Sequence, residues 1–121
     1  MRYIIAGPDE QSNHDFMKIL DGFSLLEFQG SFTTFKDAKK NVCEKPLDLA
    51  FVRIGEVTFN AYELSSEIRK KNPFSKVVFM SNHEEYALEA FECEVDGFLL
   101  IPYDEERIKN MMGRFFELRK T

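Results

Sequence analysis

The spacing of apolar and polar residues changes repeatedly along the chain, between short apolar runs and stretches with a helical period. Short runs rich in aliphatic and aromatic residues predict β-strands. The stretches between them repeat apolar residues three and four positions apart, as Leu64 and Ile68 do, which predicts amphipathic helices. The five predicted strands cover residues 3–6, 25–28, 48–52, 76–80 and 97–101.

Several element boundaries carry a recognisable capping or breaking signal. Thr33 or Thr34 can cap a helix over residues 35–44, because a hydroxyl there accepts a hydrogen bond from a free backbone N–H. The same reasoning predicts that Ser81 and Asn82 cap the helix after the fourth strand. No repeat or linker interrupts the pattern, so residues 1–121 are expected to form a single domain.

Strands that alternate with helices of this length predict right-handed crossovers and a parallel sheet covered on both faces. The unbroken apolar run at residues 77–80 is typical of a central strand. We therefore predict an α/β, flavodoxin-like (βα)5 three-layer sandwich with strand order 2-1-3-4-5.

Composition excludes some functions for this domain. The net charge of −5 argues against direct nucleic-acid binding by this domain. The apolar runs are far shorter than a membrane span, and the N-terminus enters a strand without a signal-peptide pattern. We expect a cytoplasmic domain with no membrane contact, in which Cys43 and Cys93 are free thiols.

The carboxyl ends of parallel strands are where ligands and chemistry collect. At this edge of the predicted sheet Arg53 follows the third strand, so the residue at this point is a cation and not a carboxylate. The other residues expected there follow the first, fourth and fifth strands: Pro8, Asp9, Glu10, Ser81, Ile101 and Pro102.

The segments that carry this edge resemble a known family. LDLAFVRI followed by AYELSSEIRKKNP, then KVVFMSNHEEYALEAFE, then DGFLLIPYDEERI occur in the order and spacing of the receiver domains of two-component response regulators. The second and third blocks are most similar to receivers attached to LytTR-type transcription factors. The resemblance covers essentially the whole chain.

In that family an aspartate at the end of the third strand accepts a phosphoryl group, and two acidic residues after the first strand help it to hold Mg²⁺. The resemblance places Arg53 at the acceptor position, Pro8 at one acidic position and Ile101 at the position of a lysine that contacts the phosphoryl oxygens. The residues that match the family pattern are Asp9, Ser81, Pro102 and the aromatic Phe98 at the switch position.

These departures predict a degenerate, phosphorylation-independent receiver that is not an enzyme. A guanidinium stays protonated and offers only donors, so Arg53 cannot attack a phosphoryl donor. Mg²⁺ requires several oxygen ligands, and Asp9 and Glu10 alone are weak candidates. We expect no cofactor and no metal, and another carboxylate such as Glu56 is a poor substitute acceptor.

Three hypotheses describe the Arg53 side chain. It is solvated at the sheet edge, or it pairs with Asp9 or Glu10 in the space that metal and phosphate fill in active relatives. In the third, Arg53 and Ser81 capture a small anion beside helix N-termini. That third hypothesis supports the alternative function, a small anionic ligand sensor.

The resemblance also implies an interaction surface. In similar receivers the face formed by the fourth helix, the fifth strand and the fifth helix makes dimers or partner contacts, and here it carries Tyr86, Ala90, Phe91 and Phe98. Ordinary packing is the competing interpretation for each of them. The favoured function is a signalling module that regulates an output, expected to be transcription, through protein–protein contacts.

Overall fold

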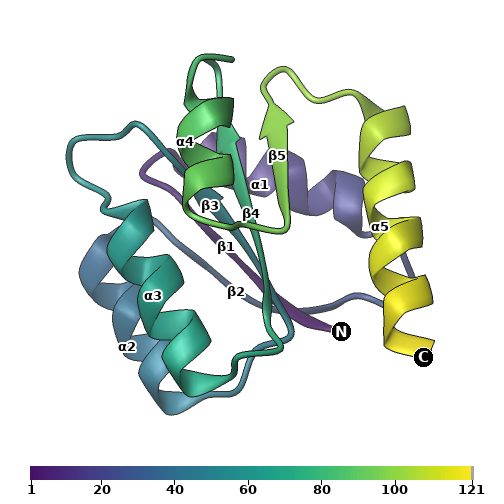
Figure 1. Ribbon diagram of the computed structural model, residues 1–121, viewed down its shortest axis with the longest axis horizontal. Helices are drawn as coiled ribbons and strands as arrows, with labels where there is room; N and C mark the ends of the chain where they lie inside the picture. The colour runs from purple at the N-terminus through teal and green to yellow at the C-terminus, as the bar shows by residue number, and fades with distance from the viewer. Residues whose placement is uncertain (121) are drawn as a thin grey trace.

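The computed structural model, which describes residues 1–120 and the last three of these by their backbone alone, contains one five-stranded parallel sheet. Its strand order is β2-β1-β3-β4-β5, as predicted (Figure 1). The strands are β1 (Arg2–Ala6), β2 (Glu27–Phe32), β3 (Leu49–Arg53), β4 (Lys76–Ser81) and β5 (Gly97–Leu100).

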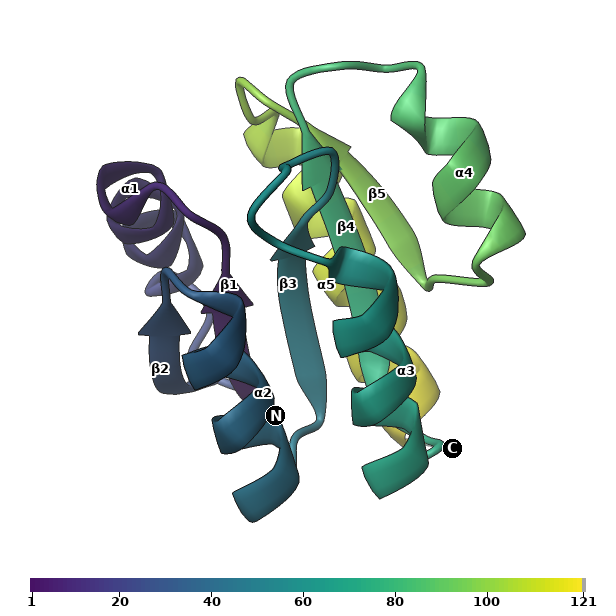
Figure 2. The same cartoon turned by 90° about the vertical axis from the view of Figure 1, so that its left-hand side faces the viewer.

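Five helices cover the two faces of this sheet and complete the predicted flavodoxin-like sandwich. They are α1 (Glu10–Leu20), α2 (Phe35–Glu44), α3 (Ala61–Lys71), α4 (Tyr86–Glu92) and α5 (Glu105–Lys120). Helices α2, α3 and α4 pack on one face, and α1 and α5 pack on the other (Figures 1 and 2).

The central strand β3 shows how the sequence sorts its side chains between these faces. Successive side chains of a strand point to opposite sides. Leu49 and Phe51 accordingly join the apolar cluster under α1 and α5, whereas Ala50 and Val52 join the cluster under α2, α3 and α4. The alternation places Arg53, the last residue of β3, on the α1/α5 face.

The prediction for the second strand is displaced. Residues 25–28 were the expected strand, but β2 begins at Glu27 and continues to Phe32, and Leu25 lies outside it with 59% of its surface exposed. The register with β1 shifts near Gly30, which has a φ of 159°. An edge strand with polar residues and an irregularity has no strong hydrophobic period, so the sequence pattern underestimates its extent.

Helix caps were predicted correctly for α2 and wrongly for α4. The Thr34 hydroxyl accepts a hydrogen bond from the Asp37 N–H at 3.2 Å. Ser81 instead ends β4, and its Oγ accepts a bond from the His83 N–H at 3.0 Å, inside the turn. Helix α4 begins only at Tyr86, and Glu85 before it makes no side-chain capping bond.

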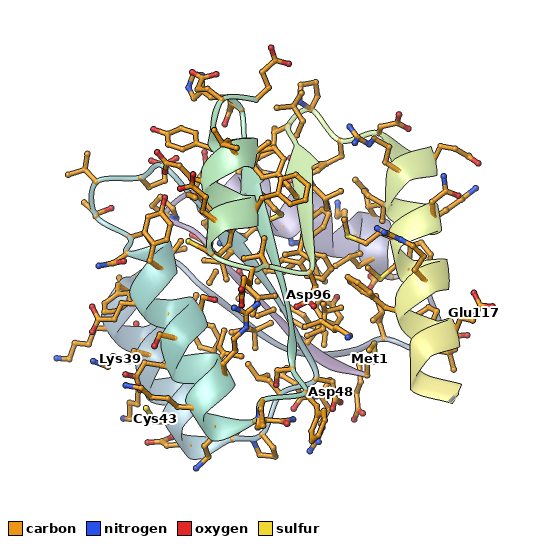
Figure 3. The ribbon with its side chains drawn as sticks, in the orientation of Figure 1. Met1, Lys39, Cys43, Asp48, Asp96 and Glu117 are labelled. Atoms are coloured by element: carbon orange, nitrogen blue, oxygen red, sulfur yellow. The ribbon has the colours of Figure 1, made fainter. Side chains whose placement is uncertain are left out.

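Two aspartates cap the amino ends of strands, opposite to the edge where Arg53 lies. The Asp48 carboxylate accepts the Arg2 backbone N–H at 2.7 Å, and the Asp96 carboxylate accepts the Val77 N–H at 2.7 Å. Figure 3 shows Asp48 beside Met1 and Asp96 at the start of β5. Both carboxylates therefore extend the hydrogen bonding of the sheet at its amino end.

The remaining expectations concern thiols and membranes. Cys43 and Cys93 are free, as predicted, and Figure 3 shows Cys43 on the outer side of α2. Across residues 1–120 the helices are too short or too polar for any of them to span a bilayer.

Candidate functional site

The loops after β3 and β4 meet at the carboxyl end of the sheet (Figure 2). Arg53 lies beneath them, and only 7% of its surface is exposed. The hypothesis of a solvated arginine at the sheet edge is therefore wrong.

The side chain of Arg53 contacts two segments that are distant in sequence and the loop that follows it directly. Its Nη1 donates to the Ser12 hydroxyl of α1 at 3.3 Å, and its Nη2 donates to the Asn82 side-chain oxygen at 2.7 Å. Its Nε lies 3.9 Å from the Glu56 carboxylate and makes no hydrogen bond. One buried cation thus joins α1, the β3–α3 loop and the β4–α4 loop.

The predicted pair between Arg53 and Asp9 or Glu10 is not formed. Asp9 is the N-cap of α1, and its carboxylate accepts the Ser12 N–H at 3.0 Å. Glu10 is exposed on the first turn. The arginine instead extends along the α1/α5 face to the Ser12 hydroxyl, and its ion pair is with Glu56.

Ser81 and Arg53 lie on opposite faces of the sheet by strand alternation. The Ser81 hydroxyl is engaged by the His83 N–H, and Asn82, the next residue, reaches the guanidinium in its place. Among the described residues, the side-chain oxygens of Ser12, Asn82 and Glu56 surround Arg53. This arrangement resembles an internal anchor more than the predicted Arg53–Ser81 anion pocket.

Gly7 leaves the room that the arginine stem occupies. A Cβ at position 7 would lie 3.0 Å from the Arg53 Cβ and 3.2 Å from the Asn13 side-chain oxygen. The buried Asn13 side chain donates to the Gly7 carbonyl at 2.9 Å, which fixes this turn against α1. The backbone after β1 and the stem of Arg53 are therefore in direct contact.

Tyr103 closes the site from the side of β5. Its ring stacks on Phe16 with centroids 4.5 Å apart, and burial raises the pKa of its hydroxyl, an effect that Ser12 and the positive charge of Arg53 oppose. Ile101, joined to Pro102 by a cis peptide bond, packs partly buried against the same apolar cluster. Apolar and aromatic groups thus occupy the side of the site where the family places a lysine.

The residues do not fit a Mg²⁺ ion. Asp9 is committed to its helix cap, and the guanidinium of Arg53 brings a positive charge to the place of a carboxylate ligand. Within residues 1–120, no three acidic, histidine or cysteine side chains lie together in a group that could hold a metal. Mg²⁺ prefers several oxygen ligands in octahedral geometry, and this edge supplies too few.

A second feature lies between α4 and α5, where a groove of about 360 Å³ runs over β5. Its wall includes Phe98, Leu99 and Met111, with Arg107 and Arg114 on the α5 side. Phe91 from α4 also lines it and is 76% exposed.

The four predicted interface residues do not behave alike. Ala90 is only 1% exposed and belongs to the core, which corrects its assignment to the surface. Tyr86 and Phe98 are partly buried and pack against the same core. Phe91 is the one of the four that projects outward.

Sequence reasoning missed Ser12, Asn82 and Gly7 as members of the site. Strand alternation was the available signal for Asn82, since it follows Val78 and Met80 on the α1/α5 face. The capping interpretation of Asn82 concealed it. Nothing in the sequence pattern distinguished Ser12 from other polar residues of α1.

Comparison with known proteins adds a family context. No family model matches the chain. The chain is 29% identical over 123 residues to the sensory transduction protein LytT of Bacillus cereus, covering 100% of this chain and 50% of that protein. It is 30% identical over 116 residues to protein MrkE of Klebsiella pneumoniae, covering 94% of this chain and 42% of MrkE.

A third relative is the transcriptional regulatory protein YpdB of Escherichia coli, 28% identical over 94% of this chain and 47% of YpdB. The chain thus spans about half the length of the curated relatives it matches. The crystal structure of the response regulatory domain of MrkE superposes with a TM-score of 0.86 at 27% identity, covering 98% of this chain and 97% of that domain.

Proposed function

The chain belongs to the receiver domains of two-component response regulators, and from that premise we propose that it signals without being phosphorylated. It regulates its output through protein–protein contacts and is not an enzyme. The observation that carries the proposal is the buried guanidinium of Arg53 at the acceptor position, anchored to Ser12 and Asn82.

The chemistry at this position supports the proposal in two ways. A guanidinium has no lone pair available for attack on a phosphoryl donor. It also repels the metal ion that phosphoryl transfer requires, because Arg53 is charged and Asp9 is already engaged as a helix cap.

Intact-mass measurement after incubation with acetyl phosphate and Mg²⁺ tests the proposal. We expect the unmodified chain to keep its mass. A variant carrying Pro8→Asp, Arg53→Asp and Ile101→Lys restores the family residues and is expected to gain the mass of one phosphoryl group. A matched Pro8→Asp, Arg53→Asn, Ile101→Lys variant controls for phosphorylation elsewhere. A phosphoryl adduct on the natural chain would refute the proposal.

The output is proposed to be transcription in the cytoplasm, mediated by a segment outside this chain. YpdB, which is a transcriptional regulatory protein by name, is about twice as long as the part that this chain matches. The net charge of −5 disfavours DNA binding by the domain itself.

The partner surface is proposed to be the groove between α4 and α5, with a second copy of the chain as occupant. Phe91 and Leu88 project from α4 with 76% and 69% of their surface exposed. Glu92 lies next to Phe91, and Arg107 and Arg114 line the facing groove. An acidic and apolar helix thus complements a basic and apolar groove across a twofold axis.

Sedimentation at increasing protein concentration tests the surface. Phe91→Ser is expected to weaken self-association by roughly tenfold or more, as loss of a central aromatic anchor does. Phe74→Ser is the matched control, because Phe74 is 86% exposed on another loop. Equal effects of both variants, or a natural chain that stays monomeric while binding another protein through this face, would contradict the second-copy proposal.

A further inference from the structure

The β4–α4 loop depends on Arg53 for a large part of its attachment. Helix α4 spans only Tyr86–Glu92 and lacks a side-chain N-cap. Within residues 82–85, the Asn82 side chain accepts a bond from Arg53 at 2.7 Å. This bond joins the loop to the α1/α5 face of the sheet, opposite to the face on which α4 packs. A charged donor makes this a stronger bond than a neutral pair would be.

The neighbouring β3–α3 loop touches the same helix. Gly55 has a φ of 89°, and a Cβ there would lie 2.8 Å from two ring carbons of Tyr86. The ring of the first α4 residue therefore packs directly on the Gly55 backbone. A side chain at this position would have to displace the ring of Tyr86.

Arg53 contacts a residue near each partner of this contact, in the loop that carries Gly55 and in the loop that leads to Tyr86. Glu56, next to Gly55, lies 3.9 Å from the Arg53 Nε, and Asn82, four residues before Tyr86, accepts from Nη2. The bond to Ser12 ties the same guanidinium to α1. The two loops that position Tyr86 are thus fastened to one buried cation.

We infer that Arg53 is a permanent internal latch that fixes the β4–α4 loop and the start of α4. The orientation of α4, and with it the groove bearing Phe91, is then set by an arginine of the chain itself rather than by an incoming group. This inference deepens the proposed function and rests on it for the use of the groove, but the latch itself rests on the contacts above.

Amide hydrogen exchange of the full chain, followed by mass spectrometry, tests the latch. Asn82→Ala and Arg53→Met are each expected to speed exchange of the amides of residues 83–92 by roughly tenfold, since one charged hydrogen bond restrains local opening. Glu84→Ala is the matched control in the same loop and is expected to leave that exchange unchanged. Exchange in β1 is expected to stay slow in Asn82→Ala.

The double variant distinguishes a latch from a general loss of packing. If the two residues act through one bond, Arg53→Met with Asn82→Ala exchanges no faster than the faster single variant. Fully additive effects, or an Asn82→Ala variant with unchanged exchange at residues 83–92, would overturn the inference. Asn82 is exposed, so its variant remains informative even where Arg53→Met unfolds.

The failures of the two proposals are distinguishable. A phosphoryl adduct on the natural chain refutes phosphorylation independence and leaves the exchange result standing. Unchanged exchange in Asn82→Ala refutes the latch and leaves the mass measurement standing.

Discussion

The two ends of the sheet use opposite charges for different purposes. At the amino end, the carboxylates of Asp48 and Asp96 accept backbone N–H groups of adjacent strands and complete the ladder. At the carboxyl end, where the family places its reactive carboxylate, the buried charge is the cation of Arg53, and its bonds go to side chains of a helix and a loop.

The comparison shows that the chain has partly buried carboxylates where they stabilise the fold and lacks one where it would react. Asp48 and Asp96 each bond within the sheet, so their removal would unpair backbone donors. Arg53 bonds Ser12 and Asn82, neither of which is part of a strand. The amino end is therefore stabilised by backbone bonds of the sheet, and the carboxyl end by one side chain that joins α1 to the β3–α3 and β4–α4 loops.

Reversing the charge at each end is expected to give the largest effects. Arg53→Glu places a buried carboxylate beside Glu56 and the Asn82 oxygen, and we expect a loss of about 3–5 kcal/mol in the free energy of unfolding. Asp48→Lys leaves the Arg2 N–H without its acceptor and is expected to cost about 1–3 kcal/mol, since position 48 is partly exposed. Urea denaturation measures both.

Arg53→Met controls for the loss of the arginine stem. It introduces no buried charge, so it is expected to lose less stability than Arg53→Glu. A smaller loss for Arg53→Glu than for Asp48→Lys would remove the distinction between the two ends.

Alkaline titration probes a tyrosine near the amino end. Burial and the nearby negative charge of Asp21 raise the pKa of Tyr3 from 10.0 to about 12. The unfolded chain then ionises first, so stability is constant below pH 10 and falls as the pH rises from about 10 to about 12. The contribution of this group is roughly 2 kcal/mol.

Tyr3→Phe is the variant that isolates this contribution. Its free energy of unfolding, measured in urea at several pH values, is expected to fall by roughly 2 kcal/mol less than that of the natural chain across this window. Identical pH profiles for the two chains would contradict the assignment.

Two glycines differ in the room that their surroundings leave for a side chain. Gly7 lies in a close contact at the carboxyl end of the sheet, and Gly113 lies on an open position of α5. Gly7→Ala is expected to cost about 1 kcal/mol, because its Cβ would meet the Arg53 stem at 3.0 Å. Gly113→Ala is expected to gain about 0.5–1 kcal/mol, since no atom lies within 4 Å and alanine favours a helix. Thermal unfolding measures both.

The cost of Gly7→Ala depends on Arg53 if this contact is its cause. In an Arg53→Gly background, which removes the Cβ that lies 3.0 Å away, the same substitution is expected to cost less than half as much. An undiminished cost in that background would assign the strain to Asn13 instead.

Most of the fold could be predicted because the buried strands carry a strong pattern. Residues 77–80 are apolar on both faces, and the alternation in β3 sorts Phe51 and Val52 to different clusters. The edge strand β2 could not be placed as well, since one of its sides is not paired and its register with β1 shifts between Phe28 and Gly30.

The site could be predicted only in part, because its key property is the direction in which the Arg53 side chain extends. The sequence identifies Arg53 at the end of a buried strand and its departure from the family pattern. Its partners depend on how the β4–α4 loop leaves the sheet, and a capping role for Asn82 satisfied the local pattern equally well. Side-chain reach across 41 and 29 residues of sequence, to Ser12 and Asn82, is a tertiary property that local reasoning does not contain.

The smallest expected effect is a change in the titration of Tyr103, which reports the charge at the carboxyl end. Burial raises the pKa of this hydroxyl, while Ser12 and the positive charge of Arg53 lower it. Arg53→Met removes the charge, so the tyrosinate form is expected to appear at a higher pH than in the natural chain. The chain contains 4 tyrosines and no tryptophan, so the ultraviolet absorbance of tyrosinate can be followed without a tryptophan background. Comparing each chain with its Tyr103→Phe counterpart isolates the signal of this residue from those of the other tyrosines.

Asp48→Asn, at the other end of the sheet, is the matched control and is expected to leave the Tyr103 midpoint unchanged. A Tyr103 midpoint that stays fixed in Arg53→Met would mean that the guanidinium does not act on this hydroxyl, whereas a shift confined to that variant ties the electrostatics of the carboxyl end to one arginine.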